Sequence, residues 1–274
     1  MPALSSESRD SVEESSAMPT PVLIDIDSSN VDQFPCCSIK SPSHPGLNAK
    51  RCWLKTHFSL GLRAKILVDA AGKPFGYIEY LPGEFAWRGV SAAGYMFIHC
   101  IWIQSKQHQH KGWGGAMIDA CLRDAKAAGM NGVAVLTREG PWSAGNRLFL
   151  AKGFKRADSA PPDYELLVRK FKARAADPTF KGGYDRKAAR LGKGLTIIRS
   201  AQCPYIAKFA AEIAQTAEEE YHLKPKTIDI ESCEDAQDAP TPYAVFAVAY
   251  DGRILADHQI SRTRFRNIMN KVMG

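Results

Sequence analysis

The feature that most constrains this chain is a long apolar segment joined to an amphipathic segment by a glycine-rich turn. Residues 95–103 are apolar at every position except His99, so we expect a strand that is covered on both faces. From Trp113 to Ala128 the apolar residues recur with helical spacing, and Gly129 is placed to end the helix. A strand, a tight turn and a helix in this order aim free backbone N–H groups at an anion.

The turn itself carries residue types that suit a pyrophosphate. Its members are Gln109, His110, Lys111, Gly112, Trp113, Gly114 and Gly115. The glycines leave the backbone open to a phosphate, and the polar and cationic side chains add donors at the rim. A tight connection without a ligand is the simpler alternative. The turn lacks the G-K-[ST] of a Walker A loop and the G-x-G-x-x-G of dinucleotide folds, which argues against nucleotide hydrolases and dehydrogenases.

Length and composition indicate an ordinary folded protein with room for two domains. The 274 residues are 45% hydrophobic and 24% charged, and the longest apolar run is too short to cross a bilayer. Residues 1–20 are rich in Ser, Glu and Pro without an apolar core, so we interpret them as a disordered tail rather than a secretion signal. Seven scattered cysteines form no disulfide framework, and we expect a cytoplasmic protein without membrane partners.

The order of the expected elements divides the chain into an α/β (α+β) domain at 21–171, a basic glycine-containing linker at 172–193 and a small α/β domain at 194–274. In the first domain we expect strands at 22–27, 64–68, 75–81, 95–103, 133–137 and 164–170 and helices at 53–62, 113–128 and 142–152. In the last we expect strands at 195–199 and 227–230, a hairpin at 243–255 and helices at 204–222 and 261–273. The basic run from Lys170 to Lys193 is the only feature that suggests nucleic acid, and a solvated linker is the commoner case.

The spacing Q-x-x-G-x-G at 109–114 resembles the acetyl-CoA signature of the GNAT superfamily, and the elements from Phe75 to Phe171 resemble the order of that fold. The resemblance implies an N-acetyltransferase that uses acetyl-CoA to acetylate an amine of a small molecule or peptide. It implies a mixed sheet in which strand 95–103 splays from strand 133–137 at the acetyl-CoA site. The backbone of Ile101, Trp102 and Ile103 would then bind the pantetheine arm.

Acetyl transfer to an amine needs a base, a donor to the carbonyl oxygen and an acid for the leaving thiolate. The candidates are Glu79, within strand 75–81, and His99, for which a satisfied core histidine is the alternative. The tyrosine that the superfamily commonly uses as the acid is replaced by Phe149, and a frequent asparagine by Trp142. A noncatalytic CoA-binding domain therefore stays open. Arg88 lies in a loop that would face the acceptor, where it either holds an acidic acceptor or is an ordinary surface arginine.

In the second domain Cys203 precedes Pro204, a suitable first residue for a helix, so we expect a lowered thiol pKa at this position. The segment Cys203-Pro204-Tyr205 resembles the active-site turn of thioredoxin-like domains, and Thr241-Pro242 their cis-proline turn. Ile206 replaces the second cysteine of a C-x-x-C pair, so a reactive single thiol and a structural one both remain possible.

A GNAT domain followed by a thioredoxin-like domain resembles the YoaP-type N-acetyltransferase family over nearly the whole chain. Residues 76–80, 87–88 and 94–102 carry this resemblance in addition to the glycine turn. The C-terminal domain would then help to bind the substrate.

A thiolate-rich metal site is the remaining hypothesis from the sequence. Its ligands would come from Cys36, Cys37, Cys52, His44 and His57. The spacing fits no standard zinc module, so we expect no metal cofactor. The alternative functions are a noncatalytic CoA-binding module and a thiol- or metal-binding module.

Overall fold

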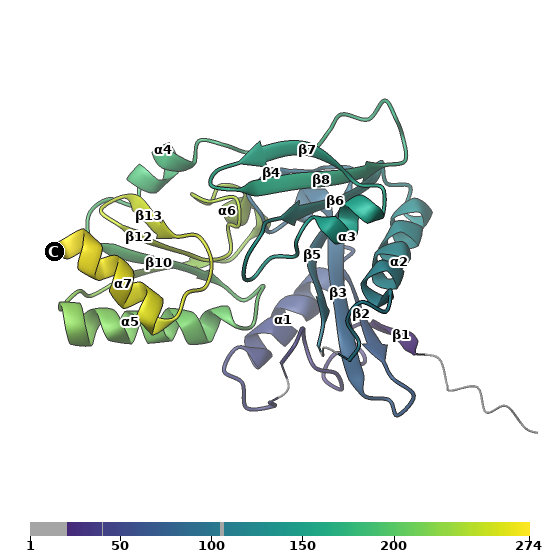
Figure 1. Cartoon of the computed structure of the whole chain (residues 1–274), viewed down its shortest axis with the longest axis horizontal. Helices are drawn as coiled ribbons and strands as arrows, with labels where there is room; N and C mark the ends of the chain where they lie inside the picture. Colours follow the sequence, from purple (N-terminus) through teal and green to yellow (C-terminus); the bar gives the residue numbers. More distant parts are fainter. Residues whose placement is uncertain (1–20, 40, 105–106) are drawn as a thin grey trace, which may run out of the picture.

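The computed structural model describes residues 21–39, 41–104 and 107–274, and the tail expected at 1–20 lies outside them. The chain forms two mixed β-sheets that lie side by side, with helices packed on both (Figure 1). The mixed α/β fold class is therefore confirmed.

The larger sheet has the order β1-β2-β3-β5-β6-β8-β7. Its strands are β1 (Val22–Ile26), β2 (Arg63–Val68), β3 (Pro74–Pro82), β5 (Met96–Ile103), β6 (Gly132–Thr137), β7 (Lys155–Ala160) and β8 (Tyr164–Lys170). All neighbours are antiparallel except β5 and β6. The expected central position of strand 95–103 is confirmed, because β5 has three strands on either side.

Alternate side chains of the larger sheet enter two different cores, as the twofold period of a strand requires. Leu67, Ile78 and Val135 pack with α2 (Trp113–Ala127) and α3 (Arg147–Ala151). Their neighbours Ile66 and Tyr77 face the opposite core, to which α1 (Leu47–Phe58) and the rest of the chain contribute. Both faces of the sheet are therefore covered, which explains its nearly continuous apolar strands.

The two parallel strands, β5 and β6, separate about halfway along their length. β5 and β6 pair only from Met96 opposite Val133 to Ile98 opposite Val135. Beyond these pairs β6 continues to Thr137 and β5 to Ile103, and no further pairing joins them among the described residues. The expected splay is thus confirmed, and a stretch of β5 backbone is left open at the middle of the sheet.

Residues 194–274, called the C-terminal unit below, form the smaller sheet with the order β11-β10-β12-β13. Its elements are β10 (Leu195–Ser200), α5 (Ile206–Tyr221), β11 (Lys226–Ile230), α6 (Cys233–Gln237), β12 (Ala247–Tyr250), β13 (Arg253–Ala256) and α7 (Arg262–Met273). β10 is parallel to β11 and antiparallel to β12, and α5 packs on β10 and α7. The resemblance of this unit to thioredoxin-like domains stays a prediction.

The segment expected to be a linker contains regular structure. β9 (Thr179–Phe180) pairs with β4 (Val90–Ser91), and α4 (Tyr184–Ala189) follows. The Tyr184 hydroxyl donates a hydrogen bond to the carbonyl of Gly89, 3.0 Å away. These elements are too short for an apolar period to reveal them. One buried apolar cluster also runs from the larger sheet into the C-terminal unit, so the two sheets share a core.

Candidate functional site

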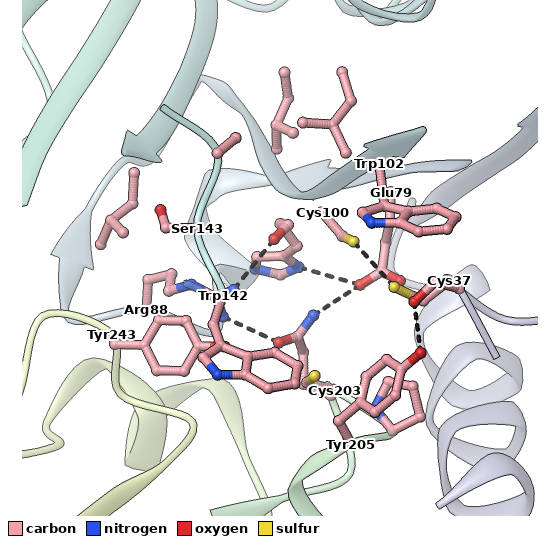
Figure 2. Close-up of a pocket in the computed structure, with 18 of the residues that line it drawn as sticks. Cys37, Glu79, Arg88, Cys100, Trp102, Trp142, Ser143, Cys203, Tyr205 and Tyr243 are labelled. Carbon is pink, nitrogen blue, oxygen red and sulfur yellow. Dashed lines mark hydrogen bonds and ion pairs between the residues drawn. The ribbon is translucent and has the colours of Figure 1, made fainter. Parts of the chain in front are cut away.

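A cavity of about 340 Å³ lies where β5 and β6 separate. The cavity has three walls. The splayed strands form the first, α1 and the loop before it form the second, and the C-terminal unit forms the third (Figure 2). Its polar and aromatic lining residues are Cys37, Ser38, Lys50, Glu79, Arg88, His99, Cys100, Trp102, Trp142, Ser143, Gln202, Cys203, Tyr205 and Tyr243. The site therefore needs both sheets to be complete.

Glu79 on β3 is the anionic centre of this cavity and is fully buried. Its Oε2 accepts a hydrogen bond from the Tyr77 hydroxyl at 2.7 Å and lies 2.6 Å from Nζ of Lys50. Its Oε1 accepts a hydrogen bond from Nε2 of Gln202 at 3.1 Å. Burial and the Glu79 charge raise the pKa of Tyr77, so this phenol stays protonated and donates.

Lys50 is the buried cation that balances Glu79. It lies on α1 with only 1% of its surface exposed, and its Nζ is 4.0 Å from the centre of the Trp53 ring. Nζ of Lys50 is within ion-pair distance of Glu79 without the geometry of a hydrogen bond, and the ammonium also faces the Trp53 ring. The pair is thus electrically neutral as a whole.

A β-bulge places His99 beside this pair. The pairing of β3 with β5 steps from Tyr80 opposite Ile98 to Glu79 opposite Cys100, so His99 is the additional residue. Nε2 of His99 accepts the backbone N–H of Trp87 at 2.9 Å, and Nδ1 lies 3.8 Å from Oε1 of Glu79. Burial, with nearby positive charge, lowers the pKa of His99 well below its usual value. His99 is therefore neutral with its proton on Nδ1, which is buried without a hydrogen-bond partner among the described residues. Its catalytic role stays a prediction.

Arg88 occupies the opposite end of the cavity from Glu79 (Figure 2). Its Nη1 donates to the Trp87 carbonyl at 2.7 Å and to Oε1 of Gln202 at 3.1 Å, and its Nη2 donates to the His99 carbonyl at 3.2 Å. Gln202 thus links Arg88 to Glu79 through its two amide atoms. Only 5% of the Arg88 surface is exposed, which excludes the alternative that it is an ordinary surface arginine.

Three thiols from separate segments line the same cavity. Sγ of Cys37 lies 3.6 Å from Sγ of Cys100, and their hydrogen bond lowers the pKa of Cys37 and raises that of Cys100. Of the cysteines considered as metal ligands, Cys36 is buried in the core and Cys52 is exposed. The described residues contain no group of three or more His, Cys, Asp or Glu side chains placed to hold a metal ion.

The expected activation of Cys203 is wrong. The helix begins only at Ile206, with Tyr205 as its N-cap, so Cys203 does not cap it. Burial raises the pKa of Cys203 to about 12, and its sulfur accepts a hydrogen bond from Nε2 of Gln259. The expected cis-proline turn is also wrong, because the Thr241–Pro242 bond is not among the cis bonds of the described chain.

The glycine turn lies at the start of α2, as expected, and its residues from Gln109 to Gly112 are exposed. Gly112 has φ +83° with nothing near its Cβ position, so it alone meets the expectation of an open, left-handed turn. A Cβ on Gly114 would meet Leu148 at 3.0 Å, and one on Gly115 would meet Lys152. These two glycines serve the packing of α2 against α3. Among the described residues, no side chain caps α2.

The two positions that depart from the superfamily pattern have different surroundings. Phe149 is fully buried against Phe154 and lies in the core beneath α2. Trp142 lines the cavity and packs against Tyr205, with 5.5 Å between ring centres. The Tyr205 hydroxyl shares a hydrogen bond of 2.6 Å with Ser38. A phenol from the C-terminal unit therefore lies beside Trp142, the position where the superfamily often has asparagine, and not beside Phe149.

Sequence reasoning missed Lys50, and in the C-terminal unit it named Cys203 and Tyr205 but missed Gln202 and Tyr243. A signal for Lys50 was present, because it falls on the buried stripe of α1 with Leu47, Trp53 and Leu54. A lysine on an apolar helix face calls for a buried partner. Gln202, Tyr205 and Tyr243 come from loops, whose positions no periodicity predicts.

Two sequence comparisons agree with the resemblance noted above. Residues 226–267 match the family model described as YoaP-like. The Bacillus subtilis (strain 168) protein named "Uncharacterized N-acetyltransferase YoaP" is 29% identical over 251 residues, which cover 90% of this chain and 98% of the relative. The likeness to YoaP-type N-acetyltransferases is thereby confirmed over both sheets.

Solved structures are similar to a little more than half of the chain, at lower identity. The Salmonella typhimurium protein yncA, a putative acetyltransferase solved with acetyl-CoA, is 15% identical, with a TM-score of 0.44 over 57% of this chain and 98% of that one. The Thermoplasma acidophilum PaiA N-acetyltransferase, solved with coenzyme A, is 12% identical, with a TM-score of 0.40 over 56% of this chain and 100% of that one.

Among the described residues, no helix has the length and apolar character needed to span a membrane.

Proposed function

We propose, from the likeness to YoaP-type N-acetyltransferases, that this chain transfers an acetyl group from acetyl-CoA to an amine of a small molecule or peptide. The observation that carries the proposal is the parting of β5 and β6 above a cavity that contains Glu79. This arrangement offers an open backbone edge for the cofactor arm and a carboxylate for the acceptor amine in one place.

The residues present fit acetyl-CoA at two positions. Beyond Ile98 the β5 backbone lacks a β6 partner among the described residues, so the backbone of Ile101, Trp102 and Ile103 is the proposed contact for the pantetheine arm. The uncapped N-terminus of α2 supplies free N–H groups and a positive dipole end for the pyrophosphate. Exposed Lys111 and His110 add cationic or polar donors at its rim.

Different residues of the cavity are the proposed proton acceptor and proton donor of the reaction. Acetyl-CoA would supply the activated acetyl group, and the acceptor amine must lose a proton before or during attack. Glu79 is the proposed proton acceptor, and Tyr77, Gln202 and Lys50 hold its carboxylate in place. Tyr205 is the proposed proton donor to the sulfur, since Phe149 carries no proton and is buried elsewhere. Burial raises the pKa of Tyr205, which keeps its proton in place at neutral pH.

Calorimetric titration with acetyl-CoA tests the cofactor site, and the chain offers a matched control. Gly112 and Gly129 flank α2 at opposite ends, both have positive φ, and both have nothing within 4 Å of a Cβ position. Aspartate is one of the residues that tolerates this conformation, so Gly112→Asp and Gly129→Asp carry similar strain and the same charge. We expect Gly112→Asp to weaken binding at least tenfold through repulsion of the phosphates, and Gly129→Asp to change it less than about twofold.

Turnover is measured in the same preparations as release of free CoA thiol with a panel of amines. If the two aspartates changed the affinity for acetyl-CoA equally, the phosphates would not bind at the N-terminus of α2. Binding without turnover of any amine would favour the noncatalytic CoA-binding alternative, for which the loss of the usual tyrosine at Phe149 is the supporting observation.

A further inference from the structure

Among the described residues, one charged side chain that faces the cavity, that of Arg88, has no partner of opposite charge. Glu79 and Lys50 neutralise one another, and His99 is neutral because its pKa is lowered well below the usual range. Burial raises the pKa of Cys203. The hydrogen bond between Cys37 and Cys100 raises the pKa of Cys100 and lowers that of Cys37, so Cys203 and Cys100 keep their protons. The Arg88 guanidinium is the cation of this cavity that no carboxylate among the described residues neutralises.

Every contact of Arg88 is with a neutral group. It donates to two backbone carbonyls and to the Gln202 amide oxygen, and its guanidinium carbon lies 4.9 Å from the centre of the Tyr243 ring. No carboxylate pairs with it in the part of the chain that the structure describes. A guanidinium carries more N–H donors than these three bonds use. A cation buried to this degree is normally paired with an anion, because desolvation is costly.

The cofactor does not provide that anion. In the proposed binding mode the negative charge of acetyl-CoA lies on phosphates at the start of α2, whereas none of the residues from Gln109 to Gly115 lines the cavity. The thioester end, which would reach the parting of β5 and β6, is neutral. The anion that complements Arg88 must therefore arrive with the second substrate.

We propose that the acceptor carries a carboxylate that Arg88 binds, so that the substrate class is an amino acid or a similar small amine with a nearby carboxylate. The inference rests on the proposed acetyl transfer. One amide group, that of Gln202, bridges Arg88 to Glu79. A zwitterion with its amine and carboxylate a few bonds apart spans the same two charged groups, with the carboxylate at Arg88 and the amine at Glu79. The C-terminal unit selects the substrate through Gln202 and Tyr243.

The test compares amino acids with their own carboxamides as acceptors, using the full chain at saturating acetyl-CoA. The amine of an amino acid carboxamide is less basic than that of the free acid, so a larger fraction of it is the neutral nucleophile. This difference alone would favour the carboxamide, and a preference for the acid is therefore the stronger evidence for the proposal. We expect kcat/KM to favour the free acid at least tenfold. In Arg88→Gln the KM for the acid should rise about ten- to a hundredfold, while that for the carboxamide stays within about twofold.

Two further variants make the result specific. Arg88→Lys keeps the charge but loses the planar fork, so an intermediate KM is expected, and it serves as well if Arg88→Gln does not fold. Arg199→Gln is the control, since Arg199 lies on β10, pairs with Asp229 and does not line the cavity. Thermal midpoints of all variants report their folding.

A binding readout separates this inference from the proposed reaction. N-acetyl amino acids and their carboxamides are titrated by calorimetry in the presence of CoA. Arg88-dependent binding of the acids without turnover of any amine would reject acetyl transfer and support the carboxylate site. Turnover with equal preference for acids and carboxamides would overturn the carboxylate site and leave the reaction standing. An equal loss of kcat for both in Arg88→Gln, or neither turnover nor binding, would also overturn it.

Discussion

The buried pair of Lys50 and Glu79 allows the sharpest test of the site, because stability and activity should separate. The side chains have relative exposures of 1% and 0%, and 2.6 Å separates Nζ from Oε2. Removing one partner of such a pair leaves a charge in a desolvated position, which costs about 3–5 kcal/mol. Replacing both by uncharged residues of similar size is often close to neutral.

The surroundings make the two single variants unequal. In Lys50→Met, Glu79 keeps its hydrogen bonds from Tyr77 and Gln202, so we expect a loss of about 2–3 kcal/mol in the free energy of unfolding. In Glu79→Gln, Lys50 loses its anionic partner and the new amide N–H₂ faces other donors, so about 3–5 kcal/mol is expected. The double variant should lose less than the sum, with a coupling of about 1–3 kcal/mol.

Urea unfolding followed by tryptophan fluorescence and by far-ultraviolet circular dichroism measures these free energies, and CoA release measures activity. We expect the double variant to recover stability but remain inactive, because the proton acceptor is absent. Single variants that each cost less than about 1 kcal/mol would show that water reaches the pair and would refute the burial argument. An active double variant would remove Glu79 from the proposed mechanism.

The remaining predictions concern a thiol and a carboxylate outside the mechanism. Burial raises the pKa of Cys203 from 9.0 to about 12, so its thiolate fraction at pH 8 falls about a thousandfold. Mass spectrometry should therefore find iodoacetamide labelling at exposed Cys52 long before Cys203. Equal labelling rates would contradict the burial of Cys203. Asp257 contacts Arg138 at 2.8 Å and His258 at 2.6 Å, and these partners outweigh burial and lower its pKa. The unfolded carboxyl thus binds protons at a higher pH than the folded one, and Asp257 contributes stability that is lost as pH falls through its folded pKa. Asp257→Asn should therefore lower stability at pH 7 by about 1–3 kcal/mol and flatten the acid limb, as measured by urea unfolding between pH 3 and about 7.

The contact between Arg138 and Asp257 also shows how the two sheets are joined. Arg138 follows β6 directly, whereas Asp257 follows β13, and Nε of Arg138 pairs with Asp163 at 2.7 Å. The splayed strand of the larger sheet is thus tied to the C-terminal unit by an ion-pair network. Arg138 and Asp257 both line a second pocket, to which residues of both sheets contribute.

Local patterns determined the elements of the fold well. The apolar run at 95–103, the helical period from Trp113 and the turn at Asp251–Gly252 predicted β5, α2 and the hairpin of β12 and β13, since spacing and turn chemistry act over a few residues. The same patterns predicted where Glu79 and His99 lie in their strands. They did not reveal β7, β9 or α4, which are exposed or only a few residues long.

Only the tertiary structure decided which groups meet in the cavity. Gln202 contacts Glu79 across 123 positions of the chain, and Tyr205 contacts Ser38 across 167. The order of helices and strands says nothing of such encounters, because they depend on how two covered sheets pack. Burial likewise raised the pKa of Cys203 where its position near a helix start predicted the opposite. The sequence by itself determined the longer strands and helices with a clear apolar period, and the packing between the sheets determined which side chains the cavity presents to an acceptor.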